Sequence, residues 1–158
     1  MFDARWWESL GGRLLGQFRL PRESAHGPGH WSRVERFGLQ LATRSGADPL
    51  VVRLFAYFHD AARVAEGGDP GHGTRGAALV ARFQREGLLR LDRRRLLLLI
   101  EACDAHSEVL HHPDPTIGTC FDADRLDLAR YGMRVDARFL NTVAAKRWVS
   151  SGINPAVT

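Results

Sequence analysis

Apolar residues recur every three to four positions along most of this chain, which is the spacing of one face of an α-helix. No stretch shows a sustained alternation of apolar and polar residues rich in β-branched types, so the pattern does not favour strands. We therefore predict an all-α fold, a bundle of about six to seven helices. In chain order, the expected helices cover residues 3–18, residues 30–43, a segment that begins at Asp48, residues 72–86, a segment from Asp92 to about Cys103, and residues 122–130 and 137–149.

Proline and glycine residues mark the boundaries of these helices. Asp48-Pro49 is typical of a helix start, because Asp caps free backbone N–H groups and Pro fits the first helical position. The helix from Asp48 is expected to continue until Gly67–Gly71 breaks it, and residues 111–121 are expected to form a loop. With no repeat or linker in the pattern, we expect one domain over 1–158, with an N-terminal helix at 3–18, a core at about 26–130, and a C-terminal helix and tail at 136–158.

Composition narrows the class of protein. With 158 residues, 44% of them hydrophobic, the chain can bury a core without disulfides or a structural metal. Cys103 and Cys120 lie in no metal-binding spacing. The longest apolar run, Leu96–Ile100, is too short to cross a membrane, and the N-terminus lacks the apolar segment of a signal peptide, so we expect a cytoplasmic protein. The net charge of +4 comes from arginines spread along the chain, so we do not expect nucleic-acid binding.

The dipeptide His59-Asp60, at the end of an apolar stretch, is the first candidate for chemistry. Neighbouring residues on a helix point about 100° apart, so both can reach one ion only if other segments supply the remaining ligands. A lone His-Asp pair is weak evidence of metal binding. Here, however, further histidines and an aspartate accompany it, namely His30, His72, His106 and Asp124.

The order of these residues resembles the HD superfamily of metal-dependent phosphohydrolases, and the resemblance extends from about His26 to Arg130. It rests on His30 followed closely by Arg33-Val34, on the doublet His59-Asp60, and on Asp124 in the context Ala123-Asp124-Arg125-Leu126. The resemblance implies an HD-domain helical bundle and an enzyme of the phosphohydrolase type. It also implies that one divalent ion is bound by four residues, His30, His59, Asp60 and Asp124.

Two imidazoles and two carboxylates suit Mn²⁺, Fe²⁺, Ni²⁺, Mg²⁺ or Zn²⁺, and the pattern leaves the choice among them open. Such an ion can polarise a phosphoryl oxygen and lower the pKa of a bound water. Asp60 is then both a ligand and a group that orients or deprotonates the water. Asp122 or Asp127 is expected to support a ligand imidazole from behind.

Other residues are candidates for substrate binding or for a second metal. His72 and His106 are expected to bind either a second ion or a phosphate group, and His26 is expected to line the pocket. Arg63 and Glu66 lie four and seven positions beyond His59, on one face if the helix continues. Arg63 is a candidate to grip a substrate phosphate and Glu66 to act as a base or second-metal ligand, with solvated ion pairing as the alternative for both.

The leading hypothesis is hydrolysis of a phosphomonoester or phosphoanhydride, in a nucleotide-like metabolite, by metal-activated water. One alternative is an HD-type dinuclear iron oxygenase, in which His72 and His106 complete an iron pair that activates O₂. Another is a non-catalytic module that binds a nucleotide or a protein partner. The sequence leaves the oligomeric state open.

Overall fold

The computed structural model describes residues 2–152, and the regular structure within them is entirely helical, which confirms the all-α prediction. The tail beyond Gly152, part of the predicted 136–158 segment, lies outside the described residues. In chain order the elements are α1 (Ala4–Gln17), α2 (Pro28–Ser45), α3 (Pro49–Phe58), α4 (His72–Arg85), α5 (Arg93–Ala105), α6 (Pro115–Leu126), the 3₁₀ turns η1 (Asp127–Tyr131) and η2 (Ala137–Phe139), and α7 (Val143–Ser150).

Aspartate caps begin several of the helices. The Asp48 carboxylate accepts hydrogen bonds from the backbone N–H groups of Leu50 and Val51, so it satisfies donors that the first turn of α3 leaves free. Asp3 and Asp92 cap α1 and α5 in the same way. The predicted starts of these three helices are therefore correct to within a residue.

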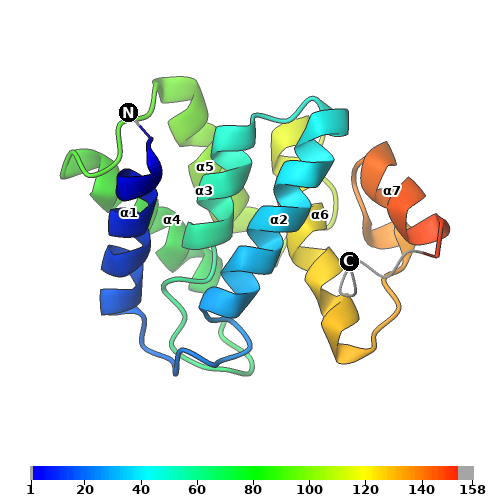
Figure 1. Cartoon of the computed structure of the whole chain (residues 1–158), viewed down its shortest axis with the longest axis horizontal. Coiled ribbons are helices and arrows are strands. Elements are labelled where there is room, and N and C mark those ends of the chain that lie inside the picture. Colours follow the sequence, from blue (N-terminus) through cyan, green and yellow to red (C-terminus); the bar gives the residue numbers. More distant parts are fainter. Residues whose placement is uncertain (1, 153–158) are drawn as a thin grey trace.

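The helices pack around α2 and α3, which lie side by side at the centre (Figure 1). Helix α1 flanks them on one side and α7 lies at the opposite end of the molecule, beyond α6. Helix α4 packs on α5, and α2 also packs on α6. Fully buried Phe37, Phe55, Phe58 and Phe121 fill the space between these helices.

Two glycines let α4 approach its neighbours closely. A Cβ atom on Gly73 would lie 2.6 Å from the carbonyl oxygen of Cys103, and one on Gly76 would lie 2.9 Å from that of His59. Both distances are too short for a side chain, so only glycine permits this contact. The first turn of α4 is thereby held against the end of α5 and against the residues that follow α3.

The third helix is shorter than predicted. It ends at Phe58, and residues 61–62 form a turn and residues 63–65 an irregular segment instead of a helix that runs to Gly67. Contacts with the following loop and with α4 explain the difference, because the Val64 N–H donates to the Asp69 carboxylate and the carbonyl of Ala62 accepts from Arg75. These hydrogen bonds replace those that a continued helix would make. The prediction that Arg63 and Glu66 share a helical face with His59 is therefore wrong.

The segment after α5 also differs from the prediction. Helix α6 begins at Pro115, inside the predicted loop 111–121, and Asp114 caps it by accepting from the N–H of Thr116. Asp114-Pro115 repeats the signal of Asp48-Pro49, but the prolines and glycine around it led to the loop prediction. The predicted helix at 137–149 is likewise divided into the turn η2 and helix α7, which Thr142 caps.

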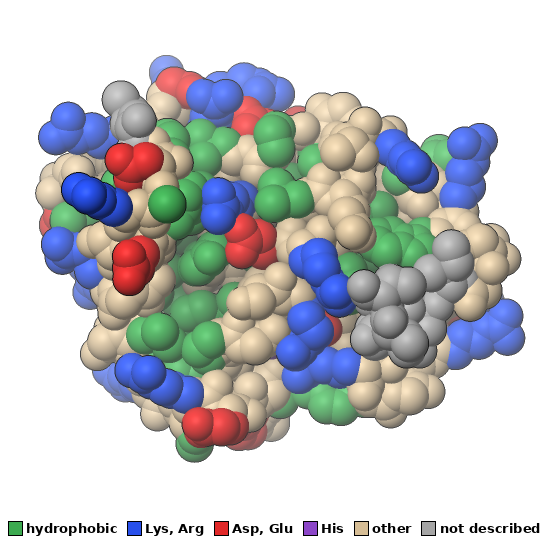
Figure 2. Space-filling view, viewed as in Figure 1, with side chains coloured by type: hydrophobic (Ala, Val, Ile, Leu, Met, Phe, Trp, Pro, Cys, Tyr) green, Lys and Arg blue, Asp and Glu red, His purple; other side chains and the backbone are tan. Residues whose placement is uncertain are grey.

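The surface carries charges of both signs. Figure 2 shows Lys and Arg side chains spread over one face, with Asp and Glu side chains among several of them. None of the helices within residues 2–152 has the length and apolar character needed to cross a membrane.

Candidate metal centre

The four predicted ligands, which come from three separate segments, converge in the structure. His30 lies in the first turn of α2, His59 and Asp60 directly follow α3, and Asp124 lies in the last turn of α6. The His30 Nε2 atom lies 3.1 Å from His59 Nε2 and 3.2 Å from Asp124 Oδ1. The Asp60 Oδ2 atom is 3.7 Å from the Nε2 atom of each histidine.

These separations fit a common cation. Two ligand atoms about 2.1 Å from one ion lie about 3.0 Å apart at a right angle and about 3.4 Å apart at a tetrahedral angle. The observed distances of 3.1 to 3.7 Å lie close to these values or slightly above them. One divalent ion therefore fits between the four side chains with little rearrangement.

Hydrogen bonds at the opposite ring nitrogens orient the first histidine pair. His30 Nδ1 lies 2.6 Å from a carboxylate oxygen of Asp127, and His59 Nδ1 lies 3.0 Å from the carbonyl oxygen of Phe55. A carboxylate and a carbonyl only accept, so each Nδ1 carries the proton and donates. In the neutral rings both Nε2 lone pairs then face each other, an arrangement that needs a cation or a proton between them.

A second histidine pair repeats this arrangement. His72 and His106 donate from Nδ1 to the carbonyl oxygens of Asp69 and Cys103, each at 2.7 Å, and their Nε2 atoms lie 2.9 Å apart. Both rings are buried, with 6% of each residue exposed. Asp60 Oδ1 lies 3.5 Å from His72 Nε2 and 3.9 Å from His106 Nε2. This second group has the donors for another cation, with fewer carboxylates.

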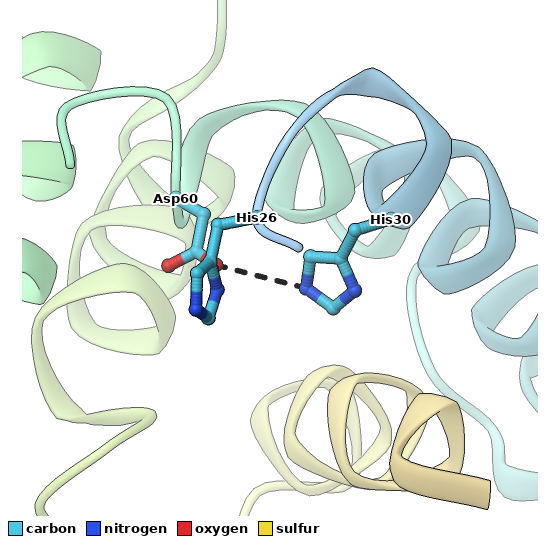
Figure 3. A group of neighbouring side chains, drawn as sticks. All are labelled: His26, His30 and Asp60. Atoms are coloured by element: carbon cyan, nitrogen blue, oxygen red, sulfur yellow. Dashed lines mark hydrogen bonds and ion pairs between the residues drawn. The ribbon is translucent and has the colours of Figure 1, made fainter. Parts of the chain in front are cut away.

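Asp60 lies between the two histidine pairs, and each of its oxygens faces one pair. Oδ2 faces His30 and also lies 2.8 Å from His26 Nδ1, as Figure 3 shows for these three side chains. Oδ1 faces His72 and accepts a hydrogen bond of 3.0 Å from Arg63 Nε. Asp60 is 97% buried and offers one carboxylate oxygen to each histidine pair.

The surrounding groups set the protonation of His30 and Asp124. Burial by itself lowers the pKa of His30, but hydrogen bonds to Asp124 and Asp127 outweigh it and raise this pKa to about 9. Burial by itself raises the pKa of Asp124, but its contacts with His30 and His59 hold the pKa far below its usual range. The four-residue group therefore concentrates negative charge on buried atoms, which favours a bound cation.

In the second pair, the pKa of His106 shifts in the opposite direction. Burial and the nearby charge of His59 lower the pKa of His106 to about 4. Burial by itself raises the pKa of Asp60, but the charge of His59 and the bond to His26 hold it well below its usual range. At neutral pH His106 is therefore neutral and Asp60 ionised, which are the forms that bind a metal.

Of the two aspartates expected behind a ligand, only Asp127 has that position. It is 99% buried, bonds His30, and is itself held by Arg33 at 2.6 Å and by Arg130 at 2.9 Å. Asp122 instead accepts hydrogen bonds from Asn141 and Thr142 and holds the start of α7. Helical spacing distinguishes the two, because Asp127 lies three positions after Asp124 and shares its face.

The remaining predicted residues surround the same centre. His26, Arg63 and Glu66 all line a cavity of about 360 Å³ that opens above the histidines. Glu66 is exposed, whereas Arg63 is buried and donates to Asp60 and to the carbonyl oxygens of Ala65 and Gly67. Arg63 therefore braces Asp60 and the turn after it, a role that the sequence did not indicate.

Several residues that complete the site were not expected from the sequence. Arg33 and Arg130 hold Asp127, while Leu128 and Tyr131 form part of the cavity wall. Two of them show a usable signal, since Arg33 follows His30 by three positions and Arg130 follows Asp127 by three. On a helix, this spacing places Arg130 beside Asp127, which it supports, and Arg33 beside His30, the hydrogen-bond partner of Asp127.

Comparisons with known proteins bear on the family and the fold. Residues 29–129 match the family model of the HD domain. The fold is similar to that of a predicted HD superfamily hydrolase from an uncultured Thermotogales bacterium, with a TM-score of 0.72 and 21% sequence identity. That similarity covers 91% of this chain and 83% of the other, and at this identity it shows a shared fold. No curated protein matches the chain.

Proposed function

Because this chain belongs to the HD-domain family, whose members are generally metal-dependent hydrolases, we propose that it hydrolyses a phosphomonoester or phosphoanhydride of a small, nucleotide-like metabolite. One observation carries the proposal. Two pairs of imidazole nitrogens, each with its lone pairs turned inward, face opposite oxygens of a single buried carboxylate, Asp60.

The donor set supports two divalent ions. His30, His59, Asp124 and Asp60 Oδ2 would hold the first, and His72, His106 and Asp60 Oδ1 would hold the second. Imidazole and carboxylate ligands suit Mn²⁺, Fe²⁺, Ni²⁺ or Zn²⁺, and Mg²⁺ fits less well because it prefers oxygen ligands. When bound, such ions polarise a phosphoryl oxygen and make water a stronger nucleophile at neutral pH.

The protein's own residues position the reacting groups. Arg63 and His26 fix the orientation of the Asp60 carboxylate from its two sides. His26 is partly exposed in the cavity, with 24% of its side chain accessible, so it can also reach a substrate. Glu66 lines the same cavity with an exposed carboxylate and is a candidate to accept a proton.

The cavity arginines have structural partners. Arg63 donates to Asp60, Arg125 donates to the carbonyl oxygens of Val109, Leu110 and Phe139, and Arg130 donates to that of Ala25. We therefore assign Arg63 to positioning Asp60 instead of gripping phosphate. Substrate phosphate would meet the metal-binding centre and His26.

A metal analysis followed by a phosphate-release screen tests the proposal. The purified protein should bind about two divalent ions per chain and release phosphate from at least one class of phosphoester in the presence of one of these metals. A chelator should abolish the release, and adding back the metal should restore it. A protein that binds the ions but releases no phosphate from monoesters, anhydrides or nucleotides would contradict the proposal.

The second histidine pair also supports one alternative, an iron-dependent oxygenase, because His72 and His106 complete a site for two ions. Iron content and O₂ consumption distinguish the two functions. Hydrolysis should proceed without O₂ and with redox-inert Zn²⁺ or with Mn²⁺, whereas an oxygenase requires iron and consumes O₂. Nucleotide binding without either reaction would indicate the non-catalytic module.

A further inference from the structure

Away from the proposed metal ligands, the wall of the cavity includes large apolar side chains. Leu128 and Tyr131, both in the turn η1, line the cavity together with the site residues. Their side chains remain exposed, with 41% of Leu128 and 54% of Tyr131 accessible to solvent. Large apolar side chains exposed beside a polar site indicate a surface that a ligand covers.

Neighbouring residues hold the Tyr131 ring in place. The guanidinium carbon of Arg130 lies 4.2 Å from the centre of the ring, which is the geometry of a cation–π contact. Arg130 is fixed in turn, since it lies 2.9 Å from the buried Asp127 carboxylate and 2.5 Å from the carbonyl oxygen of Ala25. The ring is therefore a preorganised surface, and ordering it costs a ligand little entropy.

The same helical segment carries a metal-binding residue and this ring. Helix α6 continues directly into η1, so Asp124 and Tyr131 are seven positions apart in one run. At the rise of α-helical and 3₁₀ residues this spacing separates the two backbone positions by roughly 12 Å. A phosphorylated molecule with its phosphate at the metal centre can therefore extend its other end along the wall toward Tyr131.

We propose that Leu128 and Tyr131 form a binding subsite for a flat ring, such as a nucleobase, at the end of the substrate remote from the phosphate. This inference rests on the proposed hydrolase function and names the class of substrate: phosphoesters of ring-bearing alcohols, with nucleoside monophosphates as the model compounds. Aromatic side chains favour such rings because stacking depends on the π-face and not on one pattern of hydrogen bonds.

The test compares two substrates that differ only in the ring. Adenosine monophosphate and ribose phosphate share the sugar and the phosphate, so the ratio of their kcat/KM values measures the contribution of the base. The parent protein should prefer adenosine monophosphate, and Tyr131→Ala should lower this ratio about fivefold to tenfold. Tyr131→Phe should keep the parent ratio, because the ring and not the hydroxyl provides the contact.

Phe139→Ala is the matched control. Phe139 is also an exposed aromatic residue, with 49% accessible, but it is not among the residues that line the cavity. Its removal should leave the substrate ratio as in the parent. The proposed subsite would be overturned if the parent and Tyr131→Ala proteins had equal ratios of kcat/KM. It would also be overturned if Phe139→Ala lowered this ratio as much as Tyr131→Ala does.

A binding measurement keeps this inference separate from the proposed function. Calorimetry on the metal-loaded protein gives the affinities for adenosine monophosphate and ribose phosphate whether or not either is hydrolysed. Without turnover of any phosphoester the hydrolase proposal fails, yet a weaker affinity of Tyr131→Ala for adenosine monophosphate alone would still support the ring subsite. Unchanged affinities would overturn the subsite as well.

Discussion

The two histidine pairs on either side of Asp60 share a geometry but differ in charge. The His30–His59 pair has Asp124 within 3.7 Å and Asp127 behind one ring. The His72–His106 pair has backbone carbonyls behind both rings and, among residues 2–152, one carboxylate within 4 Å of its Nε2 atoms, that of Asp60. The pKa of His30 is accordingly raised to about 9, whereas that of His106 is lowered to about 4.

Because of this difference in charge, the two proposed ions are not equivalent. A buried site with two carboxylates offsets the charge of a divalent cation better than a site with one shared carboxylate. We therefore expect the His30–His59 side to bind the first ion tightly and the His72–His106 side to bind the second more weakly. Substitutions on either side of Asp60 test this order.

Asp60→Asn should have the largest effect because Asp60 serves both sides. The amide keeps the shape of the carboxylate but removes the charge that faces each histidine pair. We expect phosphate release to fall about a thousandfold or more and both ions to bind weakly. Activity assays and elemental analysis after dialysis measure the two effects. Near-parental activity with full metal content would refute the proposed mechanism.

Asp124→Asn tests the His30–His59 side alone. It removes one of the two carboxylates that face the Nε2 atoms of that pair and leaves His72 and His106 unchanged. We expect the tight ion to bind about 100-fold more weakly, with activity regained partly at high metal concentration. Metal titration by calorimetry measures the affinity. If only the weaker ion were lost, the assignment of the two sides would be reversed.

His106→Ala tests the other side. The substitution removes one imidazole of the second pair, so the weak ion should be lost while the tight ion remains. Elemental analysis should give about one ion per chain, and phosphate release should fall about tenfold to a hundredfold. Circular dichroism serves as the control for folding. Loss of both ions from a folded protein would show that the two sides do not bind independently.

Asp127→Asn probes the support behind His30. The amide can still contact Nδ1, but it no longer carries the charge that makes the imidazole a stronger ligand. We expect the tight ion to bind about tenfold more weakly and the affinity for the second ion to change less. Competition with a chelator of known affinity measures both. A variant indistinguishable from the parent protein would reduce Asp127 to a packing role.

Asp69→Asn examines how the second side is held, because Asp69 fixes the loop whose carbonyl accepts from His72. Burial raises the Asp69 pKa, but the Val64 N–H and Arg75 outweigh it and lower the pKa to about 2. Because its pKa is lower in the folded state, ionised Asp69 stabilises that state at pH values above the unfolded-state pKa of about 3.9. This stabilisation is lost as the pH falls toward 2.

For this variant we therefore expect the free energy of unfolding to fall by about 2 kcal/mol at neutral pH. The difference from the parent should shrink as the pH falls below about 4. Urea denaturation at neutral pH and near pH 3 measures both values. A difference that grows in acid would contradict the proposed role of the Asp69 carboxylate.

Local signals in the sequence determined most of the helices, and the family resemblance predicted the four residues proposed as ligands. Asp48-Pro49 predicts the start of α3 because capping and the fixed φ of proline act within a few residues. The resemblance on His30, His59, Asp60 and Asp124 led to residues that the fold brings together. The first signal is short-range, whereas the second is the order of residue types along the chain.

Only the tertiary structure decided where α3 ends and what its following residues do. Asp69 accepts from the Val64 N–H and Arg75 donates to the Ala62 carbonyl, so the helix stops and Arg63 turns toward Asp60. The pairing of His72 with His106 depends on Gly73, which lets α4 approach α5. The Ala62–Arg75 and His72–His106 contacts join residues 13 and 34 positions apart, and no periodic pattern records them, because their energy comes from packing and charge in the folded chain.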